Sequence, residues 1–392
     1  MSNERVNRKI LILFFATFFI AAQAVGESTS SWLALSPVSE ASWQITAERE
    51  NGRVLVLEPI TMGDDPKKIL VLFPKASSAY DTAMDTILGF FLDKRKSVHF
   101  TLINFEGRPD RGLRALAWAE KTNQDLIFSM GSQSTQFIHE HYSGEKLPVV
   151  TVCSKYPVLL GQVTDYDTGS GTNIAYTSLD ASLSLQLNYL KRLKENLKNL
   201  ALLYAEDNIS AVKTQVKPMA ALARLEGINV IHIAVEKQSN ARQELRLKIP
   251  AALQVMRHTD PELLQSIFWI TGSTSVFQEI ETIDNLSQGV PVLSVVPDLV
   301  RKGELSAVLS IGVSFENNAL KAALYALEIL EKKTEPGTLK VGVVSPPDIA
   351  INFGKAQQIG LTIPFSFFES AGTIYDYKGR PAREKGRRTG AR

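Results

Sequence analysis

The chain has 392 residues, of which 44% are hydrophobic and 21% are charged, with a formal net charge of +2. This composition is typical of a globular protein long enough for two domains. The single cysteine, Cys153, excludes an internal disulfide. Residues 1–24 carry +2 and residues 378–392 carry +6, so residues 25–377 carry −6. The basic charge therefore belongs to the two ends and not to the body of the protein.

The first 24 residues have the pattern of a signal peptide. Arg5, Arg8 and Lys9 precede the apolar run 10–22, which is too short to span a bilayer comfortably, and residues 22–24 (Ala-Gln-Ala) form a small-x-small cleavage site. We expect cleavage after Ala24 and export to the periplasm. An uncleaved signal anchor is the alternative. No cysteine follows the apolar run, so a lipoprotein anchor is excluded.

Residues 25–67 are interpreted as an N-terminal extension of unknown role. Trp32, Trp43 and the run 54–57 indicate ordered structure, such as a pair of strands. From residue 68 the chain alternates between short apolar strands and helices, which predicts βαβ units and a parallel sheet covered on both faces. The predicted strands are 69–73, 100–105, 126–130 and 149–153, and the predicted helices are 81–93, 111–121 and 134–142.

A second alternating set follows a crossing predicted at 173–176. Its predicted helices are 178–197, 211–226, 242–257 and 275–286, and its predicted strands are 200–204, 230–235, 267–270, 292–296 and 307–312. Pro250 is expected to kink or split the third of these helices. The fold class predicted is α/β, with two Rossmann-like lobes of parallel sheet joined by a multi-strand hinge.

The stretch 314–364 is expected to return the chain from the second lobe to the first and back. Ser314 can cap a helix that runs to about Lys332, and residues 341–344 suggest a short buried strand. The stretch closes on Ile351, Asn352, Ala356, Gly360, Leu361, Ile363 and Pro364, in the pattern INxxxAxxxGLxIP.

This closing pattern resembles the end of solute-binding proteins of one ABC-transporter family, whose best-known members bind aromatic amino acids such as tryptophan and tyrosine. The resemblance extends over residues 69–368. It implies a type I periplasmic-binding-protein fold, with hinge segments near Ile174, Val313 and Val343. The implied domains are lobe I (68–174 with 314–336), lobe II (175–313 with 337–370) and a basic tail (371–392).

Candidate ligand-binding residues follow from the rule that ligands bind where parallel strands end at their carboxyl ends. Two glycine-serine loops that open helices point backbone N–H groups and hydroxyls toward such a site, although both serines could be helix caps instead. Two tyrosines could form aromatic walls or pack at the rim. The candidates are Ser77, Ser78, Tyr80, Gly131, Ser132, Gln133, Tyr156, Asp207, Asn208, Ser273, Thr274 and Asp298.

The second lobe departs from the pattern of amino-acid binders in this family. Their usual loop N-P-x-E-A-N-S is replaced by residues 205–211, which read AEDNISA. The acid expected shortly after the fourth strand of that lobe, a partner for the ligand's ammonium group, falls on Val296. Asp298 lies two residues later. The cleft could therefore bind a different ligand.

The sequence contains no pattern typical of an enzyme. It has no G-x-S-x-G, no Walker loop and no G-x-G-x-x-G after the first strand. His139 and His141 are two residues apart on a predicted helix, which is not a zinc spacing. We therefore expect no catalytic residue, metal or cofactor, with a two-lobed glycosyltransferase as the remaining enzymatic alternative.

We expect an exported, monomeric solute-binding protein of an ABC importer that closes on a small molecule, such as an amino acid or related carboxylate. Its expected partners are that ligand and a permease of the inner membrane, with no nucleic acid. Two alternatives stay open. The same clamp could signal to a receptor or kinase, or it could be a degenerate clamp that binds a protein.

Overall fold

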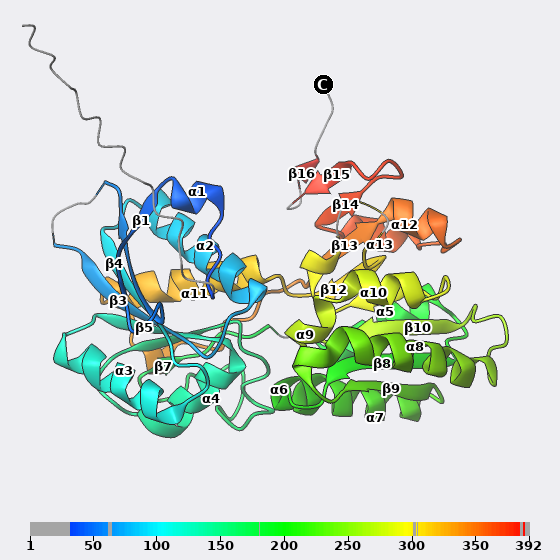
Figure 1. Cartoon of the computed structure of the whole chain (residues 1–392), viewed down its shortest axis with the longest axis horizontal. Coiled ribbons are helices and arrows are strands. Elements are labelled where there is room, and N and C mark those ends of the chain that lie inside the picture. Colours follow the sequence, from blue (N-terminus) through cyan, green and yellow to red (C-terminus); the bar gives the residue numbers. More distant parts are fainter. Residues whose placement is uncertain are drawn as a thin grey trace, which may run out of the picture.

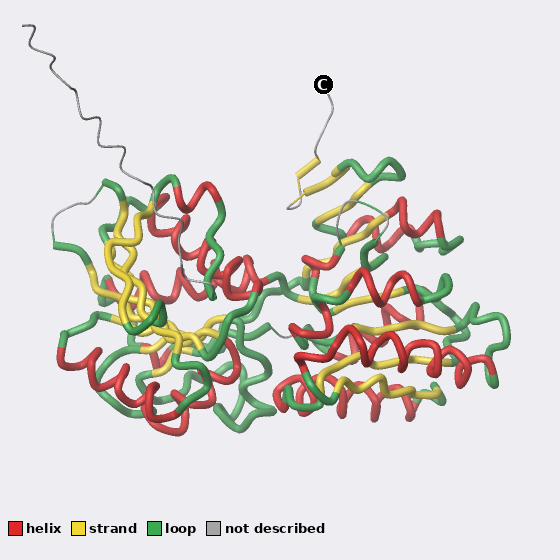
Figure 2. The backbone as a smooth tube through the Cα atoms, viewed as in Figure 1, coloured by secondary structure: helices red, strands yellow, loops and turns green. Residues whose placement is uncertain are grey.

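The computed structural model describes residues 32–61, 65–179, 181–300, 303, 305–384 and, as backbone alone, 387–388. The predicted signal peptide lies outside these residues. The described chain forms two lobes, left and right in Figure 1, and each lobe is a sheet with helices on its faces (Figures 1 and 2). The two lobes agree with the predicted α/β class.

Lobe I contains a seven-stranded sheet. In spatial order its strands are β1 (Trp43–Arg49), β2 (Val54–Pro59), β4 (Val98–Asn104), β3 (Lys67–Phe73), β5 (Leu126–Met130), β6 (Val149–Val152) and β7 (Ile174–Ala175). The strands from β4 to β7 pair in parallel, whereas β1 and β2 pair antiparallel.

Helices cover both faces of this sheet, which explains why its central strands are uninterrupted apolar runs. Ile69 and Val71 of β3 pack toward α2 (Ser78–Asp93) and α11 (Phe315–Leu330). Leu70 and Leu72 pack toward α3 (Pro109–Lys121) and α4 (Gly131–Tyr142). Side chains that alternate in sequence therefore fill two separate layers of core.

The hairpin β1–β2 belongs to lobe I. The sequence indicates ordered structure for this segment, and the structure shows that β2 pairs with β4 at the edge of the sheet. The Trp43 side chain is buried, with its ring centroid 5.4 Å from that of Phe100 on β4. The short helix α1 (Pro37–Glu40) precedes the hairpin.

Lobe II contains a nine-stranded sheet. In spatial order its strands are β16 (Arg387–Arg388), β15 (Pro381–Glu384), β14 (Thr373–Tyr375), β13 (Asp348–Asn352), β12 (Leu309–Gly312), β11 (Val292–Ser294), β10 (Ser266–Ile270), β8 (Asn199–Ala205) and β9 (Asn229–Val235). Its helices are α5 (Leu183–Leu193), α6 (Ile209–Ala211), α7 (Lys217–Leu225), α8 (Ala241–Arg257), α9 (Thr274–Phe277), α10 (Ile280–Leu286), α12 (Phe353–Gln358) and α13 (Phe365–Ser370).

The chain passes between the lobes after β7, after β12 and before β13. Helix α11, which follows β12, packs on α2 and β6 of lobe I. The Ser314 hydroxyl accepts a hydrogen bond from Asn317 N and caps α11, as the sequence predicts. The last connection passes the one-turn helix η4 (Pro336–Thr338) and an isolated parallel bridge between Thr177 and Gly342.

Some local predictions differ from the structure. Residues 341–344 make only that single bridge instead of a strand, and Val343 is 41% exposed. Helix α5 begins at Leu183 because the Ser182 hydroxyl caps it, and α8 continues through Pro250 without splitting. Residues 373–384, assigned by sequence to a basic tail, form β14 and β15, since β14 pairs with the inner strand β13.

No helix in the described ranges is both long and apolar enough to span a membrane.

Candidate functional site

A cavity of about 850 Å³ lies between the two lobes. Its walls come from segments that follow strands of both sheets, including Lys75 after β3, Ser132 after β5, Asn208 after β8 and Gly272 after β10. The carboxyl ends of parallel strands therefore face this cavity from both sides, which is where open α/β sheets bind ligands.

The two lobes touch directly around the cavity. Lys75 Nζ of lobe I donates to Gln238 Oε1 of lobe II at 3.1 Å, and the Ser77 and Thr274 hydroxyls lie 3.4 Å apart. Lys155 Nζ donates to the Gly272 carbonyl oxygen at 3.1 Å. The two lobes are thus in direct contact beside the cavity.

The first of these contacts continues into lobe II. Gln238 Nε2 donates to Asp207 Oδ1 at 2.9 Å, so the Gln238 amide bridges the Lys75 ammonium and the Asp207 carboxylate. Burial lowers the pKa of Lys75, and the charge of Asp207 partly offsets that effect. Because Asp207 sits on the opposite lobe, its charge favours the closed arrangement.

Half of the candidate residues predicted from sequence line the cavity. They are Tyr80, Ser132, Gln133, Asp207, Asn208 and Thr274. Ser132 is not a helix cap, because Met130 occupies the cap position of α4 without a side-chain bond and the Ser132 oxygen accepts from Lys155 N at 3.2 Å. The proton of the Ser132 hydroxyl is thereby left to donate elsewhere.

The other six candidates lie next to the cavity or away from it. Ser77 makes the contact with Thr274 described above, and Ser78 is exposed on the first turn of α2. Ser273 is fully buried, and its oxygen accepts from Ala205 N at 3.3 Å and from Asn208 Nδ2 at 3.4 Å. Ser273 therefore joins two loops of lobe II instead of facing the cavity.

Tyr156 and Asp298 are also not among the residues that line the cavity. The Tyr156 hydroxyl donates to the Ala181 carbonyl oxygen at 2.8 Å, which ties the first connection between the lobes. Asp298 lies on the one-turn helix η3 (Pro297–Leu299). Partial burial raises the pKa of its carboxyl group, and the carboxylates of Glu316 and Asp348 raise it further. Position 298 is therefore an unfavourable place for a second anion.

Gly131 supports the wall from behind. Its φ is +82°, a conformation that side-chain-bearing residues rarely adopt, and a Cβ built there would lie 2.6 Å from Tyr80 Cζ. The glycine thus lets the Tyr80 phenol pack directly against the backbone at the end of β5. Burial raises the pKa of Tyr80, so the phenol stays protonated at the cavity edge.

The sequence did not single out several residues that line the cavity. Gln215 lies in a π-helical turn, η1 (Val212–Val216), and its Oε1 accepts from Gly272 N at 2.8 Å. Turns of this kind occur often at functional sites, but no pattern in the sequence announces one. An apolar wall is made by Phe277, Val296 and Phe315, with the two phenyl rings 6.1 Å apart.

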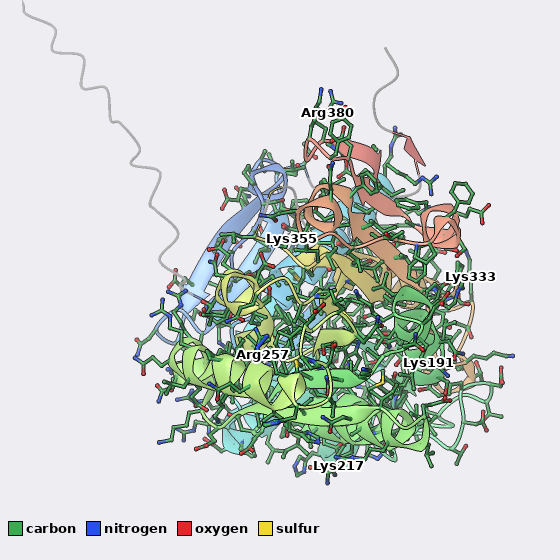
Figure 3. All side chains as sticks on the ribbon, turned by 90° about the vertical axis from the view of Figure 1, so that its right-hand side faces the viewer. Lys191, Lys217, Arg257, Lys333, Lys355 and Arg380 are labelled. Atoms are coloured by element: carbon green, nitrogen blue, oxygen red, sulfur yellow. The ribbon has the colours of Figure 1, made fainter. Side chains whose placement is uncertain are left out.

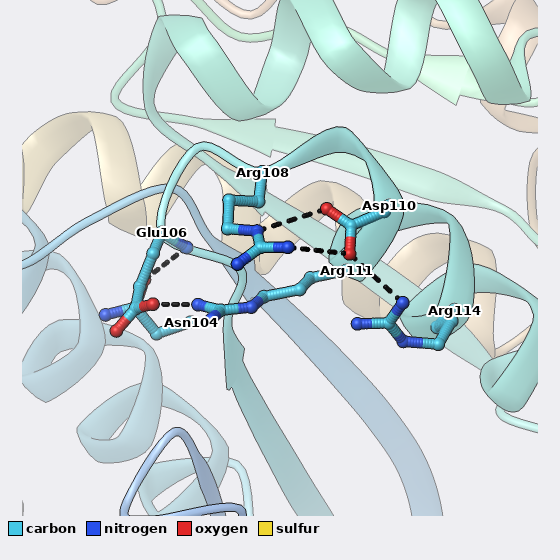
Figure 4. A network of polar contacts seen from close by, with 6 residues as sticks. All are labelled: Asn104, Glu106, Arg108, Asp110, Arg111 and Arg114. Carbon is cyan, nitrogen blue, oxygen red and sulfur yellow. Dashed lines mark hydrogen bonds and ion pairs between the residues drawn. The ribbon is translucent and has the colours of Figure 1, made fainter.

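At its outer end the cavity meets a charged network that is already paired (Figure 4). The Glu106 carboxylate, which lines the cavity, forms an ion pair with Arg111, and Glu106 N donates to Asn104 Oδ1 at 3.0 Å. Arg108 and Arg114 both bond Asp110 beside it. This end is polar and exposed, whereas the apolar wall lies deeper.

Within the described residues, no group of three or more His, Cys, Asp or Glu side chains is placed to hold a metal ion. Cys153 lines the cavity as a buried thiol, and burial raises its pKa. A protonated buried thiol is a poor nucleophile.

Residues 92–374 match the family model of ABC transporter substrate binding proteins. The chain belongs to this family. Its members are solute-binding proteins and not enzymes, and they typically work outside the cytoplasm. A search of curated protein sequences gave no match.

Solved structures share the fold. A conserved domain protein from Vibrio cholerae aligns with a TM-score of 0.64 and 19% identity, over 79% of this chain and 100% of that one. An ABC domain in complex with L-Trp from Streptococcus pneumonia gives 0.63 and 21%, over 79% and 100%. The ligand-free, open CD0873 of Clostridium difficile, a substrate binding protein with adhesive properties, gives 0.57 and 17%, over 79% and 99%. At these identities the likeness establishes the two-lobed fold.

Proposed function

We propose that this protein is the exported solute-binding component of an ABC importer and that it closes its two lobes on a small organic ligand. The observation that carries the proposal is the cavity of about 850 Å³, walled by strand-end loops of both lobes. Pockets that enclose small molecules have volumes of roughly 300–1,000 Å³. Family membership supplies the transporter context.

Closure of the two lobes couples ligand binding to delivery of the ligand to the permease. The segments after β7, after β12 and before β13 act as the hinge, and rotation about them separates Lys75 from Gln238 and Lys155 from Gly272. A ligand that contacts both walls favours the closed state, because those contacts exist only when the lobes meet. The closed protein then docks on a permease in the inner membrane.

The remaining features of the proposal concern place and partners. The signal-peptide pattern of residues 1–24 supports a periplasmic location. Lys191, Lys217, Arg257 and Arg380 lie at separate positions on lobe II in the view of Figure 3, which favours partners other than nucleic acid. We propose a monomer whose partners are the ligand and the permease.

The test has two parts. Isothermal titration of the purified protein with amino acids and small carboxylates should find a saturable ligand, and small-angle scattering should show a smaller radius of gyration when that ligand is added. Uptake of the labelled ligand should then fall in cells that lack the gene and recover when the gene is restored. Saturable binding without any change in uptake would replace import by sensing.

A further inference from the structure

The deep part of the cavity differs in charge from its mouth. Among the described residues that line it, the buried side chains with ionisable groups are Lys155, which is 9% exposed, and the protonated thiol of Cys153. The lining carboxylates, Glu106, Glu140 and Asp207, are all exposed. Charge interactions are much stronger at buried positions than at exposed ones, so among the lining residues the buried Lys155 ammonium attracts an anion more strongly than the exposed carboxylates attract a cation.

Each of those carboxylates also has a partner already. Glu106 is ion-paired with Arg111, as Figure 4 shows. Glu140 Oε1 accepts from Gln136 Nε2 at 2.7 Å, and Asp207 Oδ1 accepts from Gln238 Nε2 at 2.9 Å. A ligand ammonium would therefore compete with existing donors at the solvent-exposed rim.

Two nitrogen donors converge beside Gly272. A Cβ built on this glycine would lie 3.4 Å from Lys155 Nζ and 3.5 Å from Gln215 Nε2. Gln215 is 4% exposed, and its Oε1 is held by Gly272 N, which turns the Nε2 group toward the cavity. The Nε2 group is therefore placed to donate a hydrogen bond to a ligand oxygen.

Another part of the cavity wall is apolar. Phe277, Val295, Val296 and Phe315 line the cavity, and Val296 is 3% exposed. Val296 offers no acceptor to an ammonium ion, whose burial without a partner is strongly unfavourable.

We propose that the ligand is an organic acid with an apolar body and no amino group, its carboxylate bound by Lys155 and Gln215 and its body by Phe277, Val296 and Phe315. This inference rests on the proposed function and narrows its ligand class. The Lys155 ammonium and the Gln215 amide both supply charge-assisted hydrogen bonds to the carboxylate, because the acceptor is ionised. The Ser132 hydroxyl, held by Lys155 N, stands at the same wall as a further donor.

The experiment uses two sets of three matched compounds with the same body. One set is 3-phenylpropanoate, L-phenylalanine and 2-phenylethylamine, and the other is 4-methylpentanoate, L-leucine and 3-methylbutylamine. Isothermal titration with the purified full chain, after removal of bound solutes by dialysis in mild denaturant and refolding, gives each Kd. In at least one set the acid should bind at least tenfold more tightly than the amino acid, and neither amine should bind.

Three variants test which side chains bind the carboxylate of the acid. Lys155→Met and Gln215→Leu should each weaken binding of the preferred acid at least tenfold. Lys191→Met, the same change on the exposed surface of lobe II (Figure 3), should leave it unchanged. Circular dichroism and the melting temperature of the unliganded variants show whether each still folds. If Lys155→Met does not fold, the Gln215→Leu titration decides.

The outcomes separate this inference from the proposed function. An amino acid that binds as tightly as its matched acid overturns the inference and leaves a solute-binding protein. Unchanged acid affinity in folded Lys155→Met and Gln215→Leu also overturns it. Failure of every acid to bind overturns the inference, and failure of every compound counts against the proposed function as well.

Discussion

Replacing Gly131 by alanine tests whether the cavity wall depends on the close packing of Tyr80 against the backbone. Two separate effects should destabilise the variant. A residue with a Cβ in this left-handed conformation costs about 1–2 kcal/mol, and inserting the methyl group against the phenol adds about 1–3 kcal/mol of overpacking. The expected loss of unfolding free energy is therefore about 2–5 kcal/mol.

Gly144 provides a matched control. Its φ is +86°, close to the +82° of Gly131, but a Cβ built there has no neighbour within 4 Å. Gly144→Ala should therefore show the conformational cost alone, about 1–2 kcal/mol. Urea unfolding followed by circular dichroism measures both variants, and the difference between them isolates the contact with Tyr80.

A double-mutant cycle completes the test. In a Tyr80→Ala background the phenol is absent, so Gly131→Ala should cost no more than Gly144→Ala does in the parent protein, and the coupling energy should be about 1–3 kcal/mol. Equal losses for the two glycines in the parent, or a coupling energy near zero, would refute the claim that Tyr80 is packed against position 131.

Other substitutions test the packing, the thiol and the buried ion pair. Trp43→Ala should cost about 3–5 kcal/mol in urea unfolding if the β1–β2 hairpin is part of lobe I, whereas the exposed Val38→Ala should stay within about 0.5 kcal/mol. Burial raises the pKa of Cys153, so the folded state holds the thiol proton more tightly than the unfolded state. The contribution of Cys153 to stability should thus be lost as pH rises above the thiol's unfolded pKa, and Cys153→Ala should remove that part of the pH dependence in thermal melts. Asp284→Asn should cost about 3–5 kcal/mol because it leaves the buried Lys355 ammonium, 2.6 Å away, unpaired, while replacing both residues by apolar ones should cost less.

The fold could be predicted from the sequence because its strands are apolar runs that alternate with amphipathic helices. Residues 69–73 and 126–130 predict β3 and β5 closely, and Ser314 caps α11 as expected. Turn and edge segments were less readable. Residues 341–344 have the composition of a buried strand, but in the structure they form an isolated bridge with Thr177 and a backbone hydrogen bond from Val341 N to Tyr166 O instead of a strand.

The residues of the site could be predicted from the sequence only as far as the loops that follow the strands could be located. That rule places Tyr80, Ser132 and Thr274 at the cavity, and it also admits Ser273, which folds inward to bond Ala205 N. Successive side chains at the end of a strand point in opposite directions. The position of a serine in a loop therefore does not tell whether its side chain faces the cavity, as that of Ser132 does, or the protein interior, as that of Ser273 does. Gln215 reaches the cavity from the first turns of the helix predicted at 211–226, a position that no rule about strand ends includes.

The sequence leaves the chemical class of the ligand open. The position of the Lys155 side chain in the structure allows that class to be argued. In sequence Lys155 is one of several polar residues after the fourth strand, beside Tyr156. In the structure the two diverge, since the Tyr156 hydroxyl bonds Ala181 within the connection while Lys155 reaches across to Gly272 of lobe II. The same ammonium therefore contacts the opposite lobe and lines the cavity. A ligand anion at Lys155 would strengthen the closed state through the charge it brings to that junction, so ligand charge and clamp closure should vary together.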